Sequence, residues 1–122
     1  MKYMCLICAE VVMEQMPEAD AERHYQEYAE FTQTLRKNGQ YVGANRLLPA
    51  ATATTIRVRN GRTLVTDGPF AETKEQLGGY YLIEAKDLDE AIEIAGKIPG
   101  ARRGCVEIRP IAADAQTLAL GL

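Results

Sequence analysis

The spacing of apolar residues changes period along the chain, and each change predicts a secondary-structure element. Residues 2–9 are apolar at almost every position, which is typical of a short strand covered on both faces. From Pro17 the apolar residues recur at helical spacing until Asn38 and Gly39 interrupt them, so this segment is expected to form a helix. Residues 41–48 return to an extended pattern and predict a second strand.

The middle of the chain has the pattern of a β-hairpin. Residues 53–59 alternate between apolar and polar side chains, and residues 62–66 form the expected return strand. Asn60-Gly61 between them is the strongest short signal for a hairpin turn. The chain is then expected to change direction at Asp67-Gly68-Pro69-Phe70, because this Gly can take a positive φ and this Pro cannot extend a ladder.

The last third of the chain repeats the order strand, helix, strand. Residues 79–84 predict a strand, and residues 87–97 predict an amphipathic helix with an acidic residue at its start and a lysine at its end. Residues 105–111 alternate again and predict the last strand. Residues 112–122 are expected to form a small, mobile tail.

The complete order is β-α-β, an inserted β-hairpin, and β-α-β, which is the ferredoxin-like pattern of α+β proteins. Both helices then cover one face of an antiparallel sheet, and the other face is bare. The first strand is apolar at both its odd and its even positions, whose side chains face opposite sides of the sheet. A single copy would therefore expose an apolar patch of the size that marks an interface. We therefore expect a homodimer in which two sheets pack about a two-fold axis as a dimeric α/β barrel.

Length and charge narrow the class of protein. A chain of 122 residues is expected to form one domain, which we place at residues 1–111 and which the tail follows. A net charge of -3 and a pI near 5.2 argue against a nucleic acid partner. No apolar run approaches the roughly 20 residues that cross a bilayer, and no signal-peptide pattern is present, so we expect a cytoplasmic protein without a membrane partner.

The three cysteines raise the question of disulfides and metal binding. An odd number in a chain without a secretory signal predicts reduced thiols. Cys5-x-x-Cys8, Cys105 and His24 have the composition of a zinc site. However, residues three apart on a strand point to opposite faces, and no turn-forming residue separates the first two. We therefore expect neither a metal nor another cofactor, and interpret the thiols as small apolar residues.

His24 is the only histidine of the chain. A lone imidazole is the simplest candidate for a general base. The alternative is a packing or surface role, because the sequence identifies no partner that would orient the ring. Arg102 and Arg103, beside the last predicted turn, are interpreted as solvated surface.

The segment between Asp67 and Tyr81 has the densest set of candidate site residues. Asp67, Glu72 and Lys74 bring charge to a loop at strand ends, where binding residues are frequent. The structural alternative is scaffolding, since Thr73-x-x-Gln76 has the spacing of a capping box and predicts one helical turn over residues 73–77.

A small-molecule site would lie between this loop and the helix face that bears Tyr28. In that hypothesis Asp67 is the candidate general acid or base, and Tyr81 is a wall. The expected ligand-binding residues are Tyr28, Asp67, Glu72, Lys74 and Tyr81.

The same segment resembles the DGPF-domain family, a branch of the YCII-related proteins. The similarity is close from Asp67 to Tyr81, and residues 1–4, 51–55 and 87–91 resemble the same family, so the resemblance spans nearly all of residues 1–111. It implies a dimeric α/β barrel of ferredoxin-like halves. It also implies a family mostly without assigned activity, whose members often resemble accessories of extracytoplasmic-function sigma factors.

The resemblance also draws attention to two positions of the wider YCII family. That family is proposed to use a His on the first helix, eleven residues before the Gly that ends it, and an Asp directly before a Pro after the second helix. In this chain Tyr28 lies eleven residues before Gly39, and Ile98 precedes Pro99. The implied acid–base pair is therefore absent, and His24 lies one helical turn earlier.

Two functions remain open from the sequence. The first is a small-molecule site at the loop described above, with an unassigned reaction. The second is a non-catalytic dimer that docks a regulatory partner such as an extracytoplasmic-function sigma factor. A pocket beside Asp67 would favour the first function, whereas a filled core with an exposed apolar patch away from the dimer face would favour the second.

Overall fold

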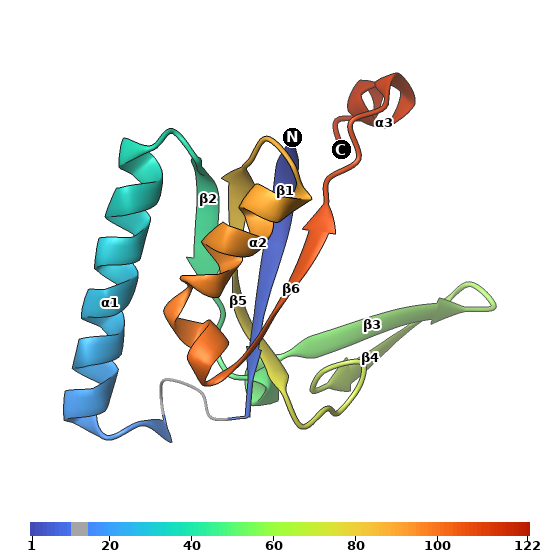
Figure 1. Cartoon of the computed structure of the whole chain (residues 1–122). Coiled ribbons are helices and arrows are strands. Elements are labelled where there is room, and N and C mark those ends of the chain that lie inside the picture. The colour runs from blue at the N-terminus through green and yellow to red at the C-terminus, as the bar shows by residue number, and fades with distance from the viewer. Residues whose placement is uncertain (11–14) are drawn as a thin grey trace.

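The computed structural model, which describes residues 1–10 and 15–122, has one four-stranded antiparallel sheet and a separate two-stranded hairpin (Figure 1). The strand order of the larger sheet is β2-β5-β1-β6, and both neighbours of the central strand β1 run antiparallel to it. The strands are β1 (Lys2–Ala9), β2 (Tyr41–Arg46), β3 (Thr54–Arg59), β4 (Arg62–Asp67), β5 (Gln76–Glu84) and β6 (Gly104–Pro110). The helices are α1 (Glu18–Lys37), α2 (Leu88–Gly96) and α3 (Ala115–Ala119), with short 3-10 segments η2 (Ala50–Thr52) and η3 (Pro99–Arg102).

This order and topology are ferredoxin-like, so the predicted α+β fold class is confirmed. Figure 1 shows α1 and α2 on the same side of the sheet. Asp87 begins α2 as expected, because its carboxylate accepts the backbone N–H of Glu90 at 2.9 Å. No helix in the described part of the chain has the length and apolar character needed to cross a bilayer.

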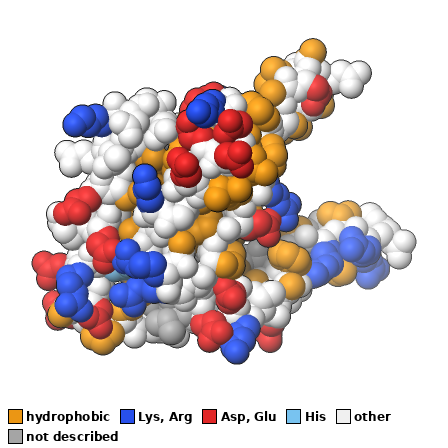
Figure 2. Space-filling model, viewed as in Figure 1, with side chains coloured by type: hydrophobic (Ala, Val, Ile, Leu, Met, Phe, Trp, Pro, Cys, Tyr) orange, Lys and Arg blue, Asp and Glu red, His pale blue; other side chains and the backbone are white. Residues whose placement is uncertain are grey.

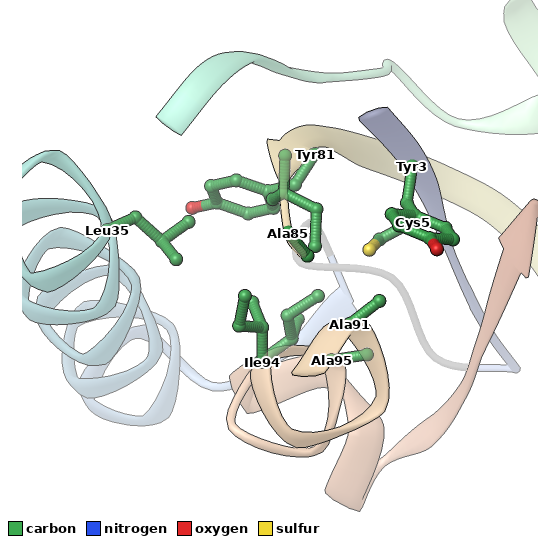
Figure 3. Packing of buried hydrophobic residues seen from close by; sticks show 10 residues of the cluster. Tyr3, Cys5, Leu35, Tyr81, Ala85, Ala91, Ile94 and Ala95 are labelled. Atoms are coloured by element: carbon green, nitrogen blue, oxygen red, sulfur yellow. The ribbon is translucent and has the colours of Figure 1, made fainter. Parts of the chain in front are cut away.

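The core lies between the sheet and the helices (Figure 3). Alternate residues of β1, among them Tyr3 and Cys5, face the helices and are buried. Ile83 of β5 and Ile98 after α2 are the largest fully buried aliphatic side chains, and burial of each contributes about 1.5–3 kcal/mol to folding. Burial also raises the pKa of the Cys5 thiol to about 11, which keeps this thiol protonated and unreactive.

The hairpin extends away from the larger sheet (Figure 1). Its turn is the expected one, since Asn60 and Gly61 both have positive φ, 52° and 74°. Register pairs Ile56 with Val65 on one side of the ribbon, and both side chains are exposed. Figure 2 shows hydrophobic side chains beside Lys or Arg side chains on this arm.

The helical turn predicted over residues 73–77 does not form. Thr73 Oγ1 donates instead to the carbonyl oxygen of Glu75 at 2.7 Å. The strand β5 begins at Gln76, before the predicted start at Gly79, and its first residues pair with the end of β1. Ladder hydrogen bonds to β1 therefore replace the local bonds of a helical turn.

The tail contains more structure than expected. Asp114 caps the short helix α3, accepting the backbone N–H of Thr117 at 2.8 Å and its hydroxyl at 2.7 Å. The leucines of this segment are exposed in the single chain.

Candidate functional site

A cavity of about 310 Å³ lies where the first half of α1 approaches the ends of β1 and β2 and the start of β5. This volume falls within the range of small-molecule sites. The walls are largely apolar or aromatic and include Ile7, His24, Tyr28, Leu47, Gly79 and Tyr81.

Tyr28, on α1, is one of the residues that line this cavity. Its phenol oxygen accepts the backbone N–H of Gly100 at 3.1 Å, so the phenol proton remains available to donate to another group. Burial raises the pKa of Tyr28 to about 12. Tyr28 is therefore a neutral hydrogen-bond donor over the whole physiological pH range.

His24 lies one helical turn before Tyr28 on the same face of α1, and the two rings meet edge-to-face with centroids 4.9 Å apart. The His24 side chain is 4% exposed, and its Nδ1 finds no hydrogen-bond partner among the described residues. Burial, and then the positive charge of Arg103, lower the pKa of His24, so the ring is neutral at pH 7. A buried polar atom left unpaired costs about 1–3 kcal/mol.

Tyr81 reaches the same cavity from β5. Its hydroxyl and Thr32 Oγ1 are 2.6 Å apart, and its ring lies nearly parallel to that of Tyr28 with centroids 6.2 Å apart. Phe31 packs edge-on against it at 5.1 Å. The structure thus brings together two of the predicted ligand-binding residues, Tyr28 and Tyr81.

Asp67, Glu72 and Lys74 are exposed and are absent from the walls of this cavity. Lys74 Nζ lies 3.5 Å from Glu10 Oε1, an ion pair on the surface. Their role in a ligand site therefore remains a prediction.

The two halves of the motif from Asp67 to Tyr81 have different structural roles. In the first half, Gly68 donates its N–H to Ala53 at 2.7 Å and takes a φ of +102°, so this part is a turn scaffold. The second half forms part of the cavity wall. Gly79 is required there, because an added Cβ would lie 2.9 Å from the Asn45 carbonyl oxygen of β2.

Two arginines line the cavity, Arg46 and Arg103. Arg102 and Arg103 are both exposed, as the sequence analysis expected, but their neighbours differ. Arg102 pairs with Glu27 on α1, whereas Arg103 is one of the residues that line the cavity. The lone His24 was a visible signal in the sequence, but nothing in the pattern distinguished one of the adjacent arginines from the other.

The cysteines are not assembled around a metal site. Within residues 1–10 and 15–122 no three His, Cys, Asp or Glu side chains form a group that could hold a metal ion. Cys5 is in the core, while Cys8 pairs in register with Cys105 at the β1–β6 ladder. All three are free thiols.

Comparison with known proteins gives a family and a fold. The YCII-related domain matches residues 1–113. An uncharacterized protein, R00369, of Rhizobium meliloti (strain 1021) is 51% identical over 69 residues, which are 55% of this chain and 56% of that protein. The match thus spans about half the length of this curated relative.

A solved structure with a similar fold is the 5-chloro-2-hydroxyhydroquinone dehydrochlorinase TftG of Burkholderia phenoliruptrix AC1100, in complex with 2,5-dihydroxybenzoquinone. Its TM-score is 0.54 at 12% identity, and the alignment covers 95% of this chain and 98% of that one. At this identity the likeness concerns the fold alone.

Proposed function

The chain belongs to the family of YCII-related domains, and from this premise we propose that it binds a small molecule in the cavity beside α1, with His24 as the acid–base residue. The observation that carries the proposal is the buried, unpartnered Nδ1 of His24 in the cavity wall. Buried polar groups in native proteins are almost always satisfied, so an unpaired atom in a cavity wall is a position where a ligand or a bound water supplies the partner.

The chemistry of the wall supports a ring-sized ligand with a polar edge. Tyr28 can donate a hydrogen bond, and neutral His24 can accept a proton when its hydrogen is on Nε2. The dehydrochlorinase with a similar fold holds a dihydroxybenzoquinone, a molecule of the size that this cavity accommodates. The reaction itself is left unassigned.

The finer family placement and the loop residues form part of the same proposal. We propose that the chain belongs to the DGPF branch of this family, a proposal supported by the motif from Asp67 to Tyr81. Asp67 is retained as the alternative acid–base residue, in which case the ligand would reach the loop that also bears Glu72 and Lys74.

A second candidate is the regulatory dimer that docks an extracytoplasmic-function sigma factor. The apolar side of the hairpin favours it, because Ile56 and Val65 are 63% and 64% exposed on an arm away from the core. The experiment below separates the two candidates, since only the first needs a ligand in the cavity.

We expect a screen of phenols, quinones and small carboxylic acids, read by thermal shift, to raise the melting temperature of the wild-type protein. A ligand at a hundred times its Kd stabilises by about 2.7 kcal/mol, or several degrees in a domain of this size. His24→Phe keeps a ring in place but removes both nitrogens, so it should lose most of this shift.

Asp67→Ala is the matched comparison and should keep the full shift. Loss of the shift in Asp67→Ala with retention in His24→Phe would move the site to the loop. The absence of any shift in the wild-type protein would remove the small-molecule function and leave the second candidate.

A further inference from the structure

The charge of the cavity wall differs from that of the rest of the protein. The chain carries 17 acidic residues and 14 Lys or Arg residues, yet the cavity is lined by Arg46 and Arg103 and, among the described residues, by no Asp or Glu. From this imbalance, and resting on the proposed function, we propose that the ligand is a small organic monoanion, an apolar ring that bears one carboxylate or phenolate group bound by Arg103.

Arg103 is the group best placed to bind the charge. Among the described residues no acidic side chain forms an ion pair with Arg103, and Glu27 on α1 pairs with Arg102 instead. Arg103 and the unpartnered imidazole of His24 line the same cavity, and the charge of Arg103 lowers the pKa of His24. A guanidinium offers a planar fork of N–H donors that matches an oxyanion.

The remaining walls restrict the rest of the ligand. Ile7, Leu47 and Leu77 give apolar surface, and the rings of Tyr28 and Tyr81 give aromatic surface. A cation would meet the positive charge of Arg103, so it is disfavoured. A phosphate dianion would need more donors, but the backbone N–H of Gly100 is already used by Tyr28.

Arg103, the apolar and aromatic walls, and His24 would each contact a different part of the ligand. The oxyanion lies toward Arg103, the ring lies against the aromatic and aliphatic walls, and a hydroxyl or other proton donor lies toward His24 Nδ1. An aromatic acid or phenolate with a second polar substituent satisfies all three.

Matched pairs of probes test this inference by isothermal titration at pH 7.5. Benzoate is compared with benzamide, and 4-nitrophenolate with 4-nitroanisole, so that each pair differs chiefly in charge. We expect the anion of at least one pair to bind about fivefold or more tightly than its neutral partner, and the two pairs distinguish a carboxylate from a phenolate.

Arg103→Gln should remove this preference and leave the affinity for the neutral partner within twofold of wild type. Arg57→Gln, which makes the same charge change on the exposed hairpin, should keep it. Equal binding of anion and neutral probe to the wild-type protein, or an unchanged preference in Arg103→Gln, would overturn the inference while leaving a small-molecule site in place. Failure of every probe, together with failure of the ligand screen, would overturn the proposed function as well.

Discussion

At the scale of single residues, His24 shows how burial and a neighbouring charge set the state of a functional group. Burial and Arg103 both disfavour the imidazolium, and both lower the pKa of the ring. Glu27 acts in the opposite direction, but its carboxylate is held by Arg102. His24 is consequently available as a proton acceptor at neutral pH.

Since the chain has one histidine, its titration is directly measurable by ¹H–¹³C NMR. We expect the pKa of His24 to lie below the ordinary value of about 6.5, so the ring charges only as the pH falls through this lower value. Arg103→Gln should raise the pKa, because it removes a nearby positive charge. Arg57→Gln should leave it unchanged, and an equal effect of both variants would show that Arg103 does not act on His24 locally.

The sequence singled out some of the residues that line the cavity and missed others. Tyr28 and Tyr81 were identified from a helix face and a strand, and the structure brings them to one cavity. Asp67 was expected in the turn, but it is the last residue of β4, where it pairs with Thr54, and the turn begins at Gly68. Sequence alone also cannot tell whether a charged residue at a strand end faces solvent or a pocket. The same limit applied to Arg103, since the direction of a side chain beside a turn depends on tertiary packing.

At the scale of elements, the short η3 segment links α2 to the cavity. An added Cβ at Gly100 would lie 2.6 Å from the Tyr28 hydroxyl and 2.8 Å from Ile7 Cγ2. Both neighbours line the cavity, so the close approach of η3 to α1 and β1 is what positions Tyr28.

Gly100→Ala is therefore expected to destabilise the protein by about 1–3 kcal/mol, the usual cost of overpacking a tight contact. Gly96→Ala is the matched control, because at this last residue of α2 an added Cβ meets no atom within 4 Å. It should be neutral or stabilise by up to about 1 kcal/mol, as Ala favours helix over Gly. The midpoints of urea unfolding give both values, and equal midpoints for the two variants would contradict the close packing at η3.

The predicted boundaries of elements agree with the structure where a local turn or a helix cap determines them. Asn60-Gly61 formed the expected hairpin turn, and Asp87 began α2. The capping-box spacing of residues 73–77 led to the wrong prediction of a helical turn. The end of this segment pairs with the end of β1, and a local sequence pattern does not show such a long-range strand pairing.

At the scale of the whole molecule, the alternation of β1 leaves one face of the sheet without a covering layer. Met4 and Leu6 are half-buried on the side opposite the buried Tyr3 and Cys5, and they pair in register with Leu82 and Tyr80 of β5. The predicted order of elements was confirmed because each period change spans several residues. The predicted homodimer stays a prediction, since it depends on what covers this second face.

We expect sedimentation equilibrium to give twice the chain mass of 13.5 kDa at micromolar concentration. Leu6→Glu should shift the protein toward the single-chain mass, because it places a charge at the centre of the proposed interface, where an unpaired charge is strongly disfavoured. Leu88→Glu makes the same change at an exposed position at the start of α2 and should remain dimeric. Circular dichroism checks that both variants are folded.

A wild-type protein that sediments as one chain would show that the open face tolerates water. Dissociation of both glutamate variants alike would show that added charge, rather than the position of Leu6, weakens the association. If the open sheet faces of two copies form a two-fold contact, the Leu6→Glu variant should dissociate and the Leu88→Glu variant should remain dimeric. It follows because Leu6 lies on the central strand, and a two-fold axis through that face brings the two copies of this strand close together.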